Sequence, residues 1–221
     1  MKQNTKIILV RHGETDYNKA ARYQGRLDVP LNKRGITQAQ RLSNCLKNIP
    51  VDIIVSSPLQ RALVTAKICA AHRNCKVRVD NRLLEIDHGK WTGQYISDLK
   101  TMHGADFALW REKPWLFAMP GGENLFDLKK RACAAFYDIA DEFAGKTALI
   151  AAHGTVNAVL LCSVLGRGLE SFNNFPQENA CINILRYDGS AWLPALIGFT
   201  EHLNDEGQFD TALQFKLNNF N

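Results

Sequence analysis

The stretch IILVRHG, residues 7–13, decides how this chain folds. Its first four residues are apolar and mostly β-branched, which predicts a short strand buried on both faces of a sheet. Arg11 and His12 follow directly, and Gly13 lets the chain turn sharply or bring its backbone close to a ligand. Open α/β sheets bind ligands at the carboxyl ends of their strands. The stretch therefore places a cation and a titratable nitrogen where a ligand is expected.

A second stretch repeats this pattern late in the chain. Residues 148–152 (ALIAA) form another apolar run, and His153 and Gly154 follow it directly. We expect two strands of one sheet, each delivering a histidine to the same edge.

Composition and charge narrow the class of protein. The chain has 221 residues, 46% hydrophobic and 22% charged, which suits one domain or a domain with a modest insertion. The net charge of +5 is not clustered, and its longest basic run, residues 129–131, falls in a predicted helix. This favours an anionic small molecule over nucleic acid as the partner.

The same data bear on the location of the protein. No apolar run reaches transmembrane length, and the four apolar residues before Arg11 are too few for a signal-peptide core. The six cysteines show no CxxC spacing and no clustering with histidine, which favours small buried hydrophobes over disulfides or zinc ligands. We expect a cytoplasmic protein with no membrane partner.

Strands alternate with amphipathic helices along most of the chain. This predicts a single three-layer α/β domain spanning residues 1–221, with a mainly parallel central sheet and helices on both faces. Ser57 and Pro58 are expected as the N-cap and first residue of a helix. Residues 14–34 are expected as loop, and the tail after Glu201 as polar surface. The predicted strands are 6–10, 51–55, 77–79 and 148–152, and the final hairpin pairs 182–187 with 192–197. The predicted helices are 36–49, 58–71, 125–143 with Asn124 as its cap, and 155–165.

The segment 83–122 is rich in aromatic residues and irregular in pattern. It holds three of the four tryptophans, together with two phenylalanines and two prolines. Such an insertion is more often a lid or a pocket wall than a second domain. Simple packing of the aromatics on the sheet edge is an alternative of nearly equal weight.

Four side chains from different elements are predicted to converge on one site. His12, His153 and Arg11 follow strand ends, and Arg61 lies in the first turn of a helix. Two guanidinium groups match phosphate oxygens, and a neutral imidazole can attack phosphorus. Glu85 would supply the acid for the leaving oxygen.

A metal site is the competing interpretation. Its ligands would be His12, His153, His88, Asp87 and Glu85. Two adjacent arginines would repel a divalent cation, so the phosphate pocket is favoured.

These residues belong to a longer series of blocks that resembles a known family. In chain order, the series is similar to the signature blocks of the phosphoglycerate-mutase-like histidine phosphatase superfamily. The blocks are LVRHGET at 9–15 with Asn18, YQGRLDVPL at 23–31, GITQA at 35–39, SSPLQRA at 56–62, Glu85 with GKWTG at 89–93, PGGE at 120–123, and AHG at 152–154.

The resemblance implies one α/β domain and a set of residue roles. His12 would be the nucleophile that forms a phosphohistidine, while Arg11, Arg61 and His153 would bind the phosphoryl group and stabilise its transition-state charge. Glu85 would be the proton donor and would then activate water. The remaining substrate contacts would come from Asn18, Gln24, Gly25, His88, Gly154 and Thr155.

The resemblance also implies that neither a metal nor an organic cofactor is needed. The neighbouring arginines give a physical check on the nucleophile: nearby cations lower the pKa of an imidazole, which keeps His12 unprotonated.

Three functions remain to be distinguished at this point. The short insertion, with Asp87 and His88 where mutases of the family carry an arginine-bearing motif, favours a phosphatase acting on a small phosphate ester with a partly apolar or aromatic leaving group. Four basic lid residues, Lys100, His103, Arg111 and Lys113, leave a polyanionic substrate open. A phosphoglycerate mutase is the alternative, and a non-catalytic phospholigand-binding module is disfavoured because every matched catalytic position is present. Self-association as a homodimer is left open.

Overall fold

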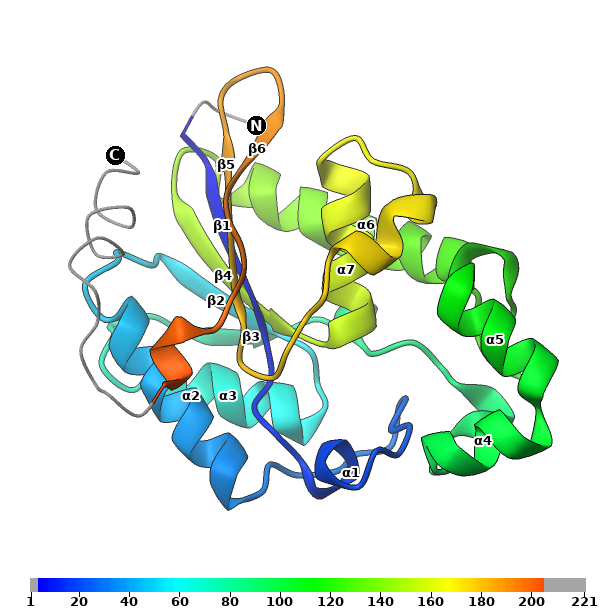
Figure 1. Ribbon diagram of the computed structural model, residues 1–221. Coiled ribbons are helices and arrows are strands. Elements are labelled where there is room, and N and C mark those ends of the chain that lie inside the picture. The colour runs from blue at the N-terminus through cyan, green and yellow to red at the C-terminus, as the bar shows by residue number, and fades with distance from the viewer. Residues whose placement is uncertain (1–3, 205–221) are drawn as a thin grey trace.

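A computed structural model of the chain describes residues 4–204 (Figure 1). Its centre is a six-stranded sheet in the order β3-β2-β4-β1-β5-β6. β1 to β4 run parallel, and β5 and β6 are antiparallel to their neighbours. The strands are β1 (Lys6–Arg11), β2 (Ile53–Ser56), β3 (Val77–Val79), β4 (Thr147–Ala152), β5 (Ile182–Tyr187) and β6 (Trp192–Phe199).

Helices cover both faces of this sheet. α2 and α3 pack together on one face, and α6 and α7 pack on the other, while α4 and α5 lie beyond the edge of the sheet (Figure 1). The predicted three-layer α/β fold is confirmed. The helices are α1 (Asp16–Lys19), α2 (Lys33–Leu46), α3 (Gln60–Ala70), α4 (Ile96–Met102), α5 (Gly104–Glu112), α6 (Leu125–Glu142) and α7 (Gly154–Val164).

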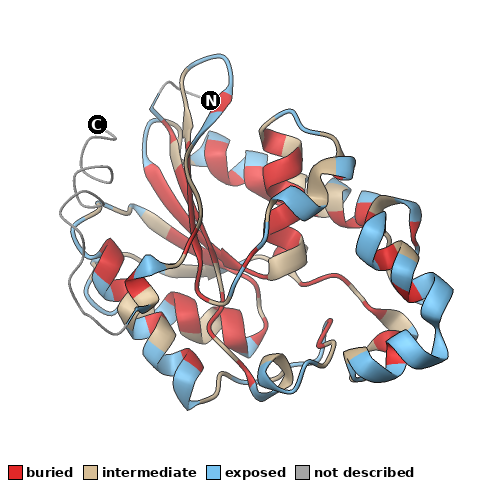
Figure 2. Ribbon diagram, in the orientation of Figure 1, coloured by how far each residue is buried: buried red, intermediate tan, exposed pale blue. Residues whose placement is uncertain are grey.

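The alternation of side chains along β1 explains why the strand is apolar throughout. Ile7 and Leu9 belong to the core cluster shared with α6 and α7, whereas Ile8 and Val10 belong to the cluster shared with α2. All four side chains are at most 1% exposed. A strand buried on both faces has no solvent side that would need polar residues. Figure 2 shows the resulting buried centre.

Side-chain caps, which the hydrophobic pattern does not reveal, place helix starts at other residues than predicted. α2 begins at Lys33, three residues before the predicted start, because the Asn32 side chain caps it by accepting the N–H of Gly35 at 2.8 Å. The loop predicted at 14–34 contains the short helix α1. A capping box between Thr15 and Asn18 starts that helix.

The predicted start of the helix at 58–71 is wrong. α3 begins at Gln60 with Leu59 as its N-cap, so neither Ser57 nor Pro58 belongs to it. The backbone of Leu59 is still extended, with ψ 132°, so Gln60 is the first helical residue. Asn124 caps α6 as predicted, by accepting the N–H groups of Phe126 and Asp127.

The final hairpin is confirmed, with β5 and β6 paired around residues 188–191. The polar tail is only partly as predicted. The turn Glu201–Leu203 buries His202 to 5% exposure, and residues 205–221 lie outside the described part of the chain. All six cysteines are free thiols, and four of them are buried. Between residues 4 and 204, no helix is long and apolar enough to cross a membrane.

Candidate active site

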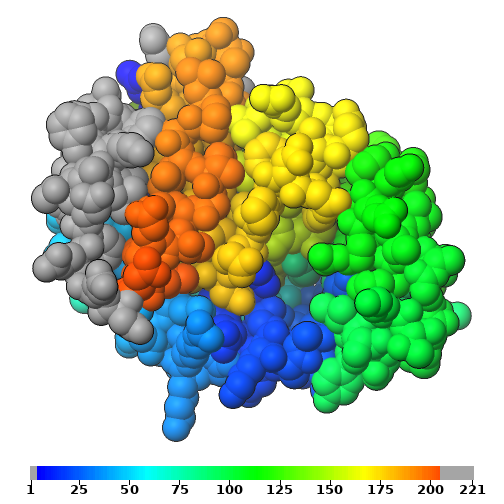
Figure 3. Space-filling model, in the orientation of Figure 1, coloured from blue at the N-terminus to red at the C-terminus, as the bar shows by residue number. Residues whose placement is uncertain are grey.

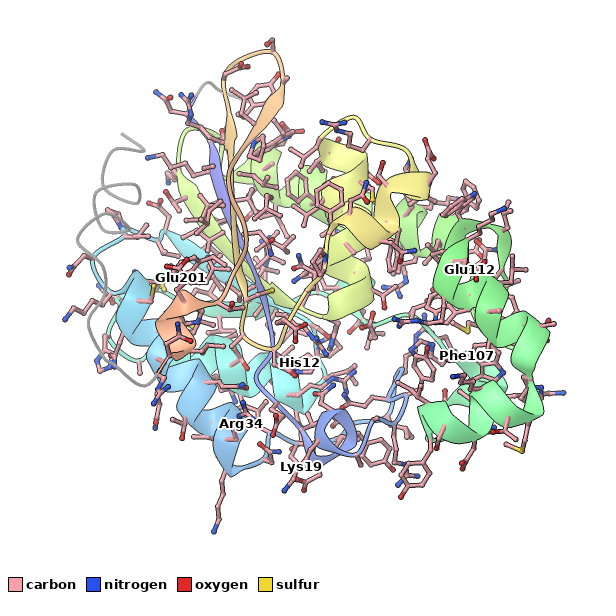
Figure 4. All side chains as sticks on the ribbon, viewed as in Figure 1. His12, Lys19, Arg34, Phe107, Glu112 and Glu201 are labelled. Carbon is pink, nitrogen blue, oxygen red and sulfur yellow. The ribbon has the colours of Figure 1, made fainter. Side chains whose placement is uncertain are left out.

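The site is built where parallel strands end. Arg11 pairs with Ala152 in the register of β1 and β4, so His12 and His153 leave adjacent strands at the same edge of the sheet. Their ring centroids lie 5.2 Å apart at an interplanar angle of 62°. Figure 4 places His12 at the lower end of β1, inside the molecule, whereas the labelled Lys19 and Arg34 lie at its periphery.

A single hydrogen bond determines which ring nitrogen of His12 carries the lone pair. Its Nδ1 lies 2.6 Å from the carbonyl oxygen of Gly13, which can only accept, so Nδ1 carries the proton and donates. The lone pair is therefore on Nε2. Burial, together with the charges of Arg61 and Arg11, lowers the pKa of His12 well below 6.5. His12 is thus a neutral imidazole at neutral pH, with Nε2 as its nucleophilic atom.

Arg61 is held by two backbone carbonyls of the neighbouring loop. Its Nη1 donates to Leu27 and its Nη2 to Gly25, both at 2.7 Å. Gly25 has φ +50°, a conformation that L residues with a side chain rarely adopt. Burial lowers the pKa of Arg61 to about 10, which leaves the group charged at neutral pH.

Arg11 is anchored in the same way, by donating through Nη1 to the carbonyl of Gln177. Its Nε and that of Arg61 are buried and have no hydrogen-bond partner within residues 4–204. A buried and a partly buried guanidinium group, each with an unused N–H donor, are suited to bind an anion.

His153 is fully buried, and its Nε2 lies 2.8 Å from the hydroxyl of Ser57. Burial and the charge of Arg61 lower its pKa well below 6.5, so this ring is neutral as well. Ser57 was expected as a helix cap and instead bonds to a site histidine. No feature of the sequence around residue 57 indicates that contact, because its partner is 96 residues away.

Glu85 reaches the site from the loop that follows β3. Its Oε1 accepts the N–H of Ile86 at 2.9 Å, and its Oε2 accepts the N–H of Thr155 at 3.3 Å. Thr155 thus donates its backbone N–H to Glu85, a contact that the sequence did not predict. The carboxylate is 9% exposed, beside the first turn of α7.

The loop after β1 contributes polar groups. The Oδ1 of Asn18 accepts the backbone N–H of Thr15 and an N–H of the Asn179 side-chain amide, which leaves the two N–H groups of its own amide for a ligand. The Oε1 of Gln24 accepts the hydroxyl proton of Thr15 at 2.9 Å.

His88 is a neutral part of the wall. Its ring is 4% exposed and lies 4.4 Å from the ring of Tyr23, measured between centroids. Burial, reinforced by the charge of Arg61, lowers its pKa to about 3.

A cavity of about 430 Å³ joins these groups. Every predicted site residue except His153 lines it, and His153 lies beside His12 in the interior. Figure 3 shows this face hollowed where the N-terminal segment meets the lid helices and the loop before β5. The cavity also has lining residues that the sequence did not predict, Arg22, Tyr23, Phe172, Phe175 and Gln177 among them, while Trp110 comes from the insertion predicted as a lid or pocket wall.

The aromatic insertion does two things at once. Trp91, Phe107 and Phe117 are buried in the core, with Trp91 stacked on Phe117 at 5.0 Å. Trp110 also lines the cavity, and its Nε1 donates to the hydroxyl of Tyr23 at 2.8 Å. Of the four basic lid residues considered in the sequence, only Arg111 lines the cavity.

Across residues 4–204, no group of three or more His, Cys, Asp or Glu side chains is arranged to hold a metal ion. The site is instead cationic, with four arginines and one carboxylate on its walls. Fold and site together define an α/β protein that binds a phosphoryl group at the carboxyl edge of its sheet.

Comparison with known proteins agrees with this class. The model of the histidine phosphatase superfamily (branch 1) matches residues 7–200, so the chain belongs to that superfamily. Phosphoserine phosphatase 1 of Hydrogenobacter thermophilus is 32% identical over 200 residues, covering 90% of this chain and 95% of the relative. A probable phosphoglycerate mutase GpmB of Proteus mirabilis is 33% identical over 210 residues, with the same two coverages.

A solved structure is similar over the same extent. YhfR of Bacillus stearothermophilus matches with a TM-score of 0.86 and 32% identity, covering 90% of this chain and all of that one.

Proposed function

We propose that the chain hydrolyses a small phosphate monoester through a phosphohistidine on His12. The observation that carries this proposal is the Nδ1 hydrogen bond of His12 to Gly13, which directs the lone pair to Nε2 in a site that Arg11 and Arg61 also line. A neutral imidazole held in this tautomer is ready to attack phosphorus without first losing a proton.

The first half of the reaction forms the phosphoenzyme. The Nε2 lone pair of His12 makes a P–N bond as the ester P–O bond breaks, and Glu85, in its acid form, gives a proton to the leaving oxygen. Arg11 and Arg61 balance the charge on the three phosphoryl oxygens in the transition state, with His153 beside them. Asn18 adds neutral donors.

The second half regenerates the enzyme. Water attacks phosphorus, the Glu85 carboxylate accepts a proton from it, and the P–N bond breaks. Inorganic phosphate and neutral His12 result. The loss of one proton by Glu85 in the first half and its recovery in the second balance the cycle.

The insertion 83–122 forms the wall that meets the leaving group in this proposal. Tyr23 and Trp110 offer an aromatic surface, and Arg111 and Arg22 offer positive charge on the same cavity. A compact leaving group with an anionic substituent fits such a wall. The substrate named for the Hydrogenobacter relative, phosphoserine, has that chemistry.

The same two arginines favour a second candidate function. A mutase must hold a hydroxy acid while it receives the phosphoryl group from His12, and Arg22 and Arg111 could bind its carboxylate. The probable mutase named among the relatives belongs to this class. The cytoplasmic location, the lack of a nucleic-acid partner and the homodimer stay predictions.

One experiment tests both candidates. Phosphate release is measured over a panel of phosphorylated metabolites, with phosphoryl exchange between phosphoglycerates followed in parallel. A phosphatase releases phosphate faster than it exchanges it, and a mutase does the reverse. His12→Ala should abolish both activities and also the acid-labile, base-stable phosphoenzyme trapped from wild type.

The matched control is His103→Ala, which removes an exposed lid histidine that does not line the cavity and should keep full activity. Turnover that survives in His12→Ala would refute the phosphohistidine mechanism.

A further inference from the structure

The block PGGE at residues 120–123 has no role in the chemistry above, yet it is bonded to the acid loop that carries Glu85. The N–H of Lys90 donates to the carbonyl of Pro120 at 2.9 Å, and the N–H of Glu123 donates to the carbonyl of Asp87 at 3.0 Å. The two segments meet backbone to backbone. A Cβ added at Gly122 would lie 2.3 Å from the carbonyl oxygen of Asp87.

The Glu123 carboxylate connects three segments of the chain. Its Oε2 accepts the backbone N–H of Asp87 at 3.1 Å, and Arg131 of α6 binds both of its oxygens at 2.8 Å. Arg26, which lies between Gly25 and Leu27 in the loop that anchors Arg61, reaches Oε1 at 2.8 Å. Burial works to raise the pKa of Glu123, but the hydrogen bonds and charge of Arg131, the N–H of Asp87 and the charge of Arg26 together outweigh it, and the pKa is lowered. The group is therefore an anion that holds two arginines.

Arg131 also binds the acid loop itself. Its Nη1 donates to the carbonyls of Arg82 at 2.8 Å and Leu84 at 2.6 Å, and its Nη2 donates to the carbonyl of Glu85 at 3.0 Å. One guanidinium group thus fixes three carbonyls within four consecutive residues, and Glu123 fixes the orientation of that guanidinium group. A lysine could not make this set of contacts, because its ammonium is a point donor rather than a planar fork.

We propose that Arg131 and Glu123 form a clamp that positions Glu85 for proton transfer. The inference rests on the proposed function, in which Glu85 is the proton donor. Within residues 4–204, the hydrogen bonds that the Glu85 carboxylate accepts come from the backbone N–H groups of Ile86 and Thr155, so its direction depends on where the loop backbone is held. Arg131 is a positioning residue: it acts on the reaction through Glu85, since it does not line the cavity.

The leaving group provides the readout that separates positioning from mere stability. An alkyl phosphate must receive a proton as its P–O bond breaks, whereas p-nitrophenolate is a stable anion that leaves without one. The rate of phosphoenzyme formation is therefore measured in single-turnover experiments with both kinds of ester. Loss of general-acid catalysis should slow the alkyl ester far more than the nitrophenyl ester.

We expect Arg131→Gln to slow the alkyl phosphate at least about tenfold more than p-nitrophenyl phosphate, as part of the range typical of general-acid catalysis. Glu85→Gln should show the same selectivity in full. The double variant should be no slower with the alkyl ester than Glu85→Gln alone, because both changes remove one function.

Two further variants provide a control and a substitute for Arg131→Gln. Arg78→Gln breaks an ion pair between β3 and α6, with Glu142 at 2.7 Å, and should leave both rates unchanged. If Arg131→Gln does not fold, as judged by its melting curve, Glu123→Gln takes its place and should show the same selectivity in weaker form.

The outcomes distinguish the clamp of Arg131 and Glu123 from the role of Glu85 as proton donor. An equal loss with both esters in Arg131→Gln, or additivity with Glu85→Gln, overturns the clamp while the role of Glu85 stands. An equal loss with both esters in Glu85→Gln overturns the proposed acid, and the clamp with it.

Discussion

His12 and His153 are neutral for the same physical reason, yet their hydrogen bonds differ. Both rings are buried among arginines, and burial is the largest cause of the lowered pKa in each. Gly13 directs the proton of His12 to Nδ1, whereas Ser57 bonds the Nε2 of His153. In our mechanism the first contact prepares a nucleophile and the second orients a phosphoryl-binding ring.

Ser57→Ala tests the second contact. Loss of one hydrogen bond to a neutral ring removes about 1 kcal/mol, which corresponds to about a fivefold lower kcat if the bond matters most in the transition state. Steady-state kinetics with p-nitrophenyl phosphate measure the change. Ser163→Ala, which removes a hydroxyl bonded to the carbonyl of Val159 within α7, is the control and should keep wild-type kinetics. An unchanged kcat in Ser57→Ala would show that His153 needs no partner at Nε2.

At the scale of elements, the site depends on loops that approach each other closely. The acid loop and the 120–123 turn touch through Gly89 and Gly122, and a Cβ on either glycine would meet backbone atoms well inside normal contact. Gly13 and Gly35 form a similar contact between the loop after β1 and the start of α2. All four glycines are needed for the space they leave, and Gly89 is also needed for its conformation, with φ +51°.

Gly122→Ala should push the acid loop away from its clamp. The added Cβ would lie 2.7 Å from the N–H nitrogen of Gly89, and backbone on both sides leaves little room to yield. We expect a loss of about 1–3 kcal/mol in the free energy of unfolding, as for other overpacked sites, and a lower kcat. Urea unfolding and initial rates measure the two effects.

Gly104→Ala provides the comparison for that variant. No atom lies within 4 Å of the Cβ it would add, so stability should be unchanged or up to about 1 kcal/mol higher at this helical position. Equal behaviour of the two alanine variants would contradict the close packing described here.

At the scale of the whole molecule, burial of histidines ties stability to pH. His88 has a pKa of about 3 and His202 of about 4, with burial as the main cause in both. A histidine whose pKa is lower in the folded state binds fewer protons there than in the unfolded chain. Stability is therefore full above the unfolded pKa of about 6.5 and falls as the pH drops towards the folded value.

His202→Phe isolates one such contribution outside the site. His202 stacks on Phe199 at 5.6 Å and is influenced by the charge of Arg41, so a phenyl ring keeps the packing and removes the titration. From pH 7 to pH 5, wild type should lose about 2 kcal/mol more stability than this variant. Urea unfolding at both pH values measures it. His72→Asn, at an exposed histidine, should behave as wild type, and an equal pH slope in His202→Phe would refute the prediction.

Much of the architecture could be predicted because its signals are local. Apolar runs of four and five residues indicated β1 and β4, and the three-to-four-residue spacing of apolar side chains indicated α2 and α6. The helix starts were predicted less accurately. Asn32 caps α2 so that it begins three residues before the predicted start, and Ser57 bonds to His153 and does not cap α3. The Ser57 hydroxyl also accepts the N–H of Leu59 at 3.4 Å, but it does not cap α3, because that helix begins only at Gln60.

The amino-acid sequence by itself determined the parallel sheet, the residues at its strand ends, and so the edge at which Arg11 and His12 lie. Only the tertiary structure decided that Arg111 lines the cavity while Lys113 does not, that Ser57 bonds to His153, and that Arg131 holds the acid loop. The physical reason is the distance along the sequence over which each kind of interaction acts. Periodicity and strand-end rules act within one element, whereas each of these contacts requires segments tens of residues apart to be packed first.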